Sequence, residues 1–201
     1  MLQNKSVTRE LLELLRFLML QEEFNDFALV GGTSLALQMG HRVSVDIDLF
    51  GRCEIDEAFF LNKISTQGDV HVLRKSRNIL ICAVDGIKVD FVNYHYPLLE
   101  DILLIDGIRM ASKIDIAAMK INAVAGRGSK KDFIDIFYLL NYFTIEQMLG
   151  FYLSKYQDGS EFMARKSLTY FEDADLEEMP VLFENISWNE IKQRILDAQK
   201  L

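Results

Sequence analysis

The chain has 201 residues, of which 50% are hydrophobic and 26% charged, so it can bury a core and suits one domain or one domain with a helical extension. Its formal net charge is −8, which is opposite to the charge of most proteins with a long nucleic-acid footprint. This balance argues against general nucleic-acid binding, although basic residues cluster locally at 74–77 and 127–131.

The two cysteines, Cys53 and Cys82, have no paired spacing. This excludes a disulfide framework and a cysteine-based zinc site, and it favours a reducing compartment, so we expect a cytoplasmic protein. The apolar run near the N-terminus is interrupted by Glu13 and Arg16 and lacks the order of a signal peptide. We therefore expect an amphipathic helix there, with no membrane as a partner.

The first hundred residues alternate between helix and strand signals. The leucine spacing at 11–18 predicts a helix, and further helices are predicted at 33–39, where Gly40 is a stop signal, and at 56–64. Strands are predicted at 27–30, 45–50, 70–74, 78–84, 87–93 and 102–105, and Asp85-Gly86 is a strong hairpin turn between two of them.

Beyond about residue 110 the pattern predicts helices alone, at 113–124, 132–141, 145–154, 161–169 and 189–198. Strands mixed with helices, followed by helices alone, are typical of an α+β fold. We expect a mixed β-sheet core with flanking helices in residues 1–110 and a helical C-terminal region in residues 111–201.

Two carboxylates, Asp46 and Asp48, share one face of a predicted strand, because alternate side chains point the same way. Two adjacent carboxylates repel each other, and a divalent cation with oxygen ligands offsets that cost. Asp90 lies on the polar face of the strand at 87–93 and is the expected third acid, although it could be an ordinary solvated residue. These three carboxylates predict a binding site for Mg²⁺, which would hold two ions if the protein catalyses phosphoryl transfer.

The pair Gly31-Gly32, followed by Thr33 and Ser34, ends a strand and opens a helix. Backbone N–H groups at a helix N-terminus bind phosphate, and glycine permits its close approach. The alternative is an ordinary strand-to-helix turn. The segment is neither a dinucleotide fingerprint nor a P-loop, so on its own it predicts no more than a contact with phosphate.

Lys113, Lys120 and Arg127 are seven residues apart and fall on one helix face, which predicts a phosphate-binding face or simply a solvated basic one. Asp132 and Asp135 share a face of the next helix, with Asp132 near its N-terminus. An acid there also stabilises the helix dipole without any catalytic role.

The stretch LVGGTSLALQMGHRVSVDIDLF resembles the nucleotidyltransferase signature, in which Gly-Gly or Gly-Ser precedes Asp-x-Asp. It looks more specifically like the AbiEii-type toxins of type IV toxin–antitoxin systems, within the polymerase β-like nucleotidyltransferases. Two further motifs match that family. Asp115 to Lys120 fits Asp-x4-Lys, and Lys131-Asp132-x-x-Asp135 fits Lys/Arg-Asp-x-x-Asp.

The resemblance implies a Mg²⁺-dependent enzyme that moves an NMP from an NTP to a tRNA or protein acceptor and that has a cognate antitoxin. It implies that Lys120 contacts the triphosphate. Two alternatives stay open: a small-molecule nucleotidyltransferase of the antibiotic-modifying type, and a catalytically silent module that binds an antitoxin. The predicted catalytic residues are Asp46, Asp48, Asp90, Lys120 and Asp132, and the predicted nucleotide contacts are Gly31, Gly32, Thr33, Ser34, Lys113, Lys120 and Lys131.

Overall fold

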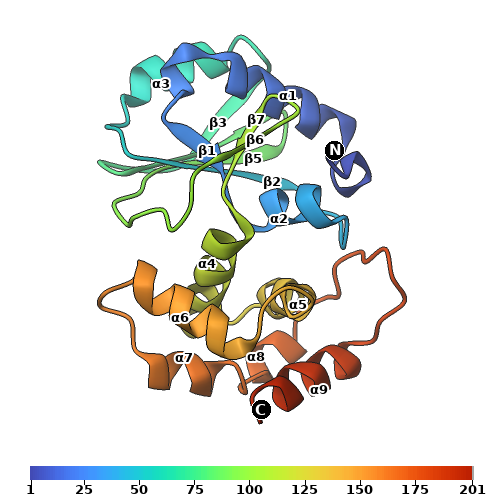
Figure 1. Ribbon diagram of the computed structural model, residues 1–201. Coiled ribbons are helices and arrows are strands. Elements are labelled where there is room, and N and C mark those ends of the chain that lie inside the picture. Colours follow the sequence, from blue (N-terminus) through green and yellow to red (C-terminus); the bar gives the residue numbers. More distant parts are fainter. Residues whose placement is uncertain (201) are drawn as a thin grey trace. The chain divides into compact units, whose positions relative to one another are not determined.

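The computed structural model describes residues 1–200, and its internal contacts divide it into two compact units (Figure 1). The first unit comprises residues 1–40, 44–95 and 102–111. The second comprises residues 41–43, 96–101 and those from 112 onward. Two short segments from before residue 110 thus belong with the C-terminal helices. The division into two domains at residue 110 stays a prediction.

A seven-stranded mixed sheet forms the first unit, in the order β3-β4-β5-β2-β1-β7-β6. Strands β2 and β5 are parallel, as are β1 and β7, and the other neighbours are antiparallel. The predicted α+β class with a mixed sheet is confirmed. The strands are β1 (Phe27–Leu29), β2 (Asp46–Gly51), β3 (Val70–Ser76), β4 (Ile79–Val84), β5 (Ile87–Asn93), β6 (Leu103–Ile105) and β7 (Ile108–Met110).

The helices of this unit pack on the sheet through a cluster of aromatic rings. Phe24, Phe27, Phe60 and Phe91 meet at ring-centroid distances of 4.9–6.5 Å, mostly edge to face. Alternation in β2 and β5 sends the apolar side chains into this core and the carboxylates to the other face. The helical segments are η1 (Asn4–Ser6), α1 (Arg9–Leu20), η2 (Glu22–Phe24), α2 (Gly31–Met39) and α3 (Glu57–Ile64).

The second unit is helical, as expected for the C-terminal region. Helix α4 (Lys113–Gly126) packs against α5 (Lys130–Leu139), α6 (Ile145–Lys155) and α7 (Glu161–Ser167). Ser112 caps α4 by accepting the N–H of Asp115, and capping boxes begin α6 and α9 (Trp188–Ala198). The short helix α8 (Glu172–Asp175) has only four residues and was not predicted.

Strand β7 is the main element that the sequence pattern did not predict. It pairs with β6 across Asp106 and Gly107, which have φ values of 50° and 81°. The predicted turn at Asp85 and Gly86 has nearly the same geometry, with φ values of 46° and 84°. The same Asp-Gly signal was therefore present at both hairpins.

Two expectations about composition can be checked directly. Cys53 and Cys82 are both free thiols, as expected. None of the helices within residues 1–200 has the length and apolar character needed to cross a membrane.

Candidate active site

Three carboxylates are brought onto one face of the sheet by the parallel pairing of β2 with β5. The register places Asp48 beside Asp90 and Asp46 beside Lys88. Neighbouring strands lie about 4.8 Å apart, and paired residues point to the same face. Asp48 and Asp90 are therefore lateral neighbours, and Asp46 lies two residues back along the same face.

Lys88 shares this face and contacts the carboxylates directly. Its Nζ lies 2.6 Å from Oδ2 of Asp90, whose side chain is only 14% exposed. Burial acts to lower the pKa of Lys88, but the hydrogen bond to Asp90 and the charges of Asp90, Asp48 and Asp46 outweigh it and raise the pKa. The ammonium group thus lies in the combined field of all three acids and offsets part of their repulsion.

The donor set suits a hard divalent cation. Three carboxylates offer the oxygen ligands that Mg²⁺ prefers, and the buried Oδ1 of Asp90 has no hydrogen-bond partner within residues 1–200. In the same described range, no group of three or more His, Cys, Asp or Glu side chains already converges as a metal-binding cluster. Lys88 occupies Oδ2 of Asp90, so its ammonium takes one of the oxygens that a metal could bind.

Gly31 is required by the close approach of its backbone to Asp48. Its φ is +66°, a conformation that residues with side chains rarely adopt. A Cβ atom at this position would lie 2.6 Å from Oδ2 of Asp48. The N–H of Val30 also donates to the carbonyl of Asp48 at 2.9 Å, so the glycine turn and the acidic strand are held together.

The hydroxyl groups of Thr33 and Ser34 are buried and already have partners. Thr33 Oγ1 donates a hydrogen bond to the carbonyl of Asp46 and lies 2.8 Å from Ser44 Oγ. Ser34 Oγ accepts from Gln38 Nε2 at 3.1 Å. Thr33 thus anchors the start of α2 to the start of β2. The contact of both hydroxyls with phosphate stays a prediction.

In the second unit, Lys120 lies in a buried cluster of charges. Its Nζ is 2.8 Å from Asp132 Oδ1 and 2.6 Å from Asp135 Oδ2. Arg42 binds Asp135 through two hydrogen bonds of 2.7 and 3.0 Å, and His41 Nε2 lies 2.8 Å from the same carboxylate. All five side chains are buried.

The charges in this cluster determine its protonation. Burial acts to lower the pKa of Lys120, but Asp135 and Asp132 outweigh it and raise the pKa. Burial acts to raise the pKa of Asp132, but Lys120 and Arg127 outweigh it and lower the pKa from 3.8 to about 2. The same balance, with Arg42 and Lys120 as the main cations, holds the pKa of Asp135 well below its usual range. Lys120, Asp132 and Asp135 are therefore ionised at neutral pH.

The predicted basic face of α4 is not continuous. Arg127 caps the end of the helix and donates to both oxygens of Asp132 at 2.8 and 3.0 Å. Lys113 is half-buried, and its Nζ lies 5.1 Å from the ring centroid of Tyr142. Lys131 is exposed. The roles predicted for Lys113, Lys120, Lys131 and Asp132 in nucleotide binding or catalysis stay predictions.

Sequence reasoning missed the contacts of Lys88, His41 and Arg42. The contact of Lys88 could have been predicted, because Lys88 and Asp90 are two residues apart on the polar face of one strand. The contacts of His41 and Arg42 could not, because Asp135 lies more than ninety residues away in the chain.

A family model described as nucleotidyl transferase AbiEii toxin, type IV TA system, matches residues 13–201. The chain belongs to this AbiEii family. A nucleotidyltransferase fold and activity follow from that membership, as the sequence motifs predicted. An uncharacterized protein of Aquifex aeolicus (strain VF5) is 38% identical over 177 residues, and the match covers 84% of each chain.

Solved structures share the fold of this AbiEii protein. JHP933 from Helicobacter pylori matches with a TM-score of 0.62 and 18% identity, covering 96% of this chain and 88% of that one. The nucleotidyltransferase toxin MenT4 from Mycobacterium tuberculosis H37Rv matches with a TM-score of 0.58 and 16% identity, covering 96% and 83%. At such identities the likeness concerns the fold alone.

Proposed function

We propose that this AbiEii nucleotidyltransferase moves a nucleoside monophosphate from an NTP to a tRNA or protein acceptor, with Mg²⁺ held by Asp46, Asp48 and Asp90. The observation that carries the proposal is the parallel register that sets Asp48 beside Asp90, with Gly31 packed against the Asp48 carboxylate. Only a residue without a side chain can bring its backbone this close to the Asp48 carboxylate.

In the proposed reaction an acceptor hydroxyl oxygen forms a bond to the α-phosphorus while the bond to the β-phosphate oxygen breaks. Pyrophosphate leaves, and the hydroxyl proton passes to Asp90 or to water. Bound Mg²⁺ neutralises charge that develops on the phosphates. The residues of the chain act by positioning: the α2 N-terminus at Gly31 and Gly32 presents N–H groups to the triphosphate.

Lys88 has a defined place in this proposal. Its ammonium lies 2.6 Å from Oδ2 of Asp90, so a metal held by that oxygen would compete with it. A Lys88 side chain displaced in this way would be free to contact the phosphates, where a cation is also favourable. The three carboxylates would then have a cation beside them both with and without bound metal.

The test is incubation with each labelled NTP, Mg²⁺ and either total tRNA or a cell lysate. Label is expected in RNA or in protein, and label in a small molecule would favour the antibiotic-modifying alternative. Asp48→Asn keeps the size of the side chain and is expected to reduce transfer about a hundredfold or more. Glu13→Gln, on the exposed side of α1, is the matched control. Transfer that is equally fast with Asp48→Asn would overturn the proposal.

The family also implies a cognate antitoxin. The proposed reaction would take place in the cytoplasm, because its NTP substrates are found there. We propose that growth arrest follows when the acceptor is modified in excess of the antitoxin. Expression of the wild-type chain should stop growth, whereas expression of Asp48→Asn to the same level should not.

A further inference from the structure

A polar pocket lies in the first unit, beyond the ends of β2 and β5. Its volume is about 870 Å³, within the range of roughly 300–1,000 Å³ that small ligands occupy. Asn93 lies three residues beyond Asp90 on β5, so the strand separates them by about 10 Å and turns them to opposite faces. The pocket is therefore distinct from the carboxylate site.

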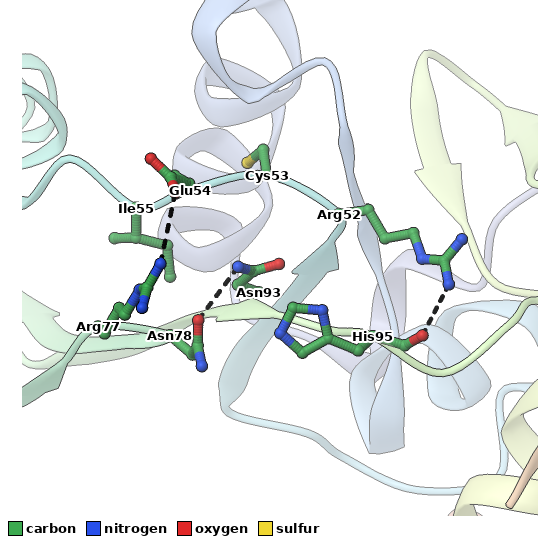
Figure 2. A pocket seen from close by; sticks show the side chains of 8 residues that line it. All are labelled: Arg52, Cys53, Glu54, Ile55, Arg77, Asn78, Asn93 and His95. Carbon is green, nitrogen blue, oxygen red and sulfur yellow. Dashed lines mark hydrogen bonds and ion pairs between the residues drawn. The ribbon is translucent and has the colours of Figure 1, made fainter.

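Two exposed arginines stand on opposite sides of this pocket (Figure 2). Arg52 donates one hydrogen bond of 2.8 Å to the carbonyl of His95, so most of its N–H donors remain for a ligand. Arg77 is 3.9 Å from Glu54, and both side chains are about 90% exposed, so this contact is weak. Each guanidinium group has the planar fork of donors that binds a phosphate bidentately.

Neutral polar groups lie between the two arginines in Figure 2. Asn93 Nδ2 donates to Asn78 Oδ1 at 3.1 Å, which uses one group of each amide. The Asn93 carbonyl oxygen and the Asn78 NH₂ group remain as an acceptor and a donor. Such a pair matches the edge of a nucleobase, and the His95 ring offers a flat surface for stacking.

The remaining wall is unreactive. Cys53 and Ile55 line the pocket and pack against the hydrophobic core. Burial and the nearby Asp26 raise the pKa of the Cys53 thiol, which therefore stays protonated at neutral pH. The pocket has no catalytic constellation of its own and is suited to binding.

We propose that this pocket binds one nucleotide unit, with its phosphate on one of the two arginines and its base against Asn78, Asn93 and His95. The unit comes either from a single-stranded segment of RNA or from a free mononucleotide. The RNA source rests on the proposed function, in which RNA is an acceptor, and the free-nucleotide source does not.

The experiment measures binding of a short fluorescent single-stranded RNA, of each free NMP and of inorganic phosphate to the full chain at one fixed ionic strength. The double variant Arg52→Gln, Arg77→Gln is expected to weaken binding about tenfold, whichever of the two arginines holds the phosphate. Arg16→Gln, which removes an exposed arginine of α1, is the matched control and should leave binding unchanged. Asn93→Asp should weaken it as well, because a carboxylate repels phosphate.

RNA binding that only the pocket variants weaken supports the RNA source, and the same result with a free NMP supports the free-nucleotide source. Three outcomes overturn the proposal: neither probe binds, Arg16→Gln weakens binding as much as the pocket variants do, or inorganic phosphate binds as tightly as the NMP. Thermal unfolding of each variant separates lost binding from lost folding.

The double variant Asp46→Asn, Asp48→Asn separates this proposal from the proposed function. It should abolish nucleotidyl transfer while leaving binding in the pocket intact. If the wild-type chain transfers no label from any NTP, the proposed function fails, whereas the binding result still decides the role of the pocket.

Discussion

At the scale of single residues, Gly31 links backbone conformation to the position of a carboxylate. Its positive φ and the short distance from a hypothetical Cβ to Asp48 are two separate constraints. Substitution would either rotate the turn or push the carboxylate away. The geometry of the acidic site therefore depends on a residue that carries no functional group.

Gly31→Ala should destabilise the fold by about 1–2 kcal/mol and reduce nucleotidyl transfer by a larger factor than the loss of folded protein explains. Urea unfolding and the labelled-NTP assay measure the two effects. The matched control is Gly126→Ala, since nothing lies within 4 Å of a Cβ there. Equal loss of activity in both variants would contradict this prediction.

Lys88 would compete with a metal ion for the carboxylate of Asp90 in the proposed site. Lys88→Met should tighten the binding of Mn²⁺, used as a spectroscopic substitute for Mg²⁺, by about tenfold, because a nearby positive charge is removed. Electron paramagnetic resonance of free Mn²⁺ measures this without any turnover.

Lys63→Met serves as the control for Lys88→Met. Lys63 is similarly exposed and forms an ion pair of 2.9 Å with Glu23. If Lys88→Met binds Mn²⁺ no more tightly than Lys63→Met, the competition between Lys88 and metal is refuted.

At the scale of elements, the sequence predicted those parts of the sheet whose side chains alternate. Strand β5 was predicted at its observed bounds, 87–93, because charged and apolar residues alternate there and Asp85-Gly86 defines the turn. Its pairing with β2 could be anticipated only as a way of bringing Asp90 to Asp48. The parallel direction of that pairing could not be predicted, because it depends on the arrangement of the whole sheet.

The charged cluster of α4 and α5 could not be predicted in the same way. The seven-residue spacing of Lys113, Lys120 and Arg127 is equally consistent with a solvent-exposed face and with a phosphate-binding face. What decides the environment of Lys120 is the packing of α5 against α4, together with Arg42 from a distant segment. Such burial depends on tertiary structure, and the local pattern carries no signal for it.

This cluster predicts a loss of stability in acid. The pKa of Asp132 is about 2 when folded, compared with its ordinary value of 3.8, so the folded chain binds fewer protons. Its contribution, about 2 kcal/mol, is complete above pH ~4 and is lost as the pH falls toward ~2. Asp132→Asn should make the unfolding free energy less dependent on pH over this interval, as measured by urea unfolding.

The control for the acid-stability prediction is Asp158→Asn, at an exposed acid of the same unit. It should leave the dependence on pH as in the wild type. A wild-type chain whose stability is constant from pH 4 to pH 2 would refute the assignment of the low pKa to Asp132.

At the scale of the whole molecule, ligand binding should raise the stability of the folded chain. On the acidic face, one oxygen of Asp90 has no hydrogen-bond partner within the described residues and could bind a cation. Mg²⁺ at about a hundred times its dissociation constant should therefore stabilise the chain by about 2.7 kcal/mol. Thermal unfolding with and without Mg²⁺ at constant ionic strength measures this.

The double variant Asp46→Asn, Asp48→Asn should not respond to Mg²⁺ in that measurement. The net charge of −8 makes this comparison necessary, because any divalent cation screens repulsion among surface acids. An equal rise in the melting temperature of both proteins would show general screening and would contradict a specific site.

The side-by-side register of β2 and β5 also limits how homologous chains can vary in length. Strands β3 and β4 lie between β2 and β5 in the sequence. Of these two strands, only β4 pairs with β5. Insertions at the exposed hairpin tips of these strands would leave the acids where they are. Deleting one residue within β5 ahead of Asp90 would turn that carboxylate into the phenylalanine-rich interior. Natural length changes in this enzyme should therefore gather at the outer turns and spare the two inner strands.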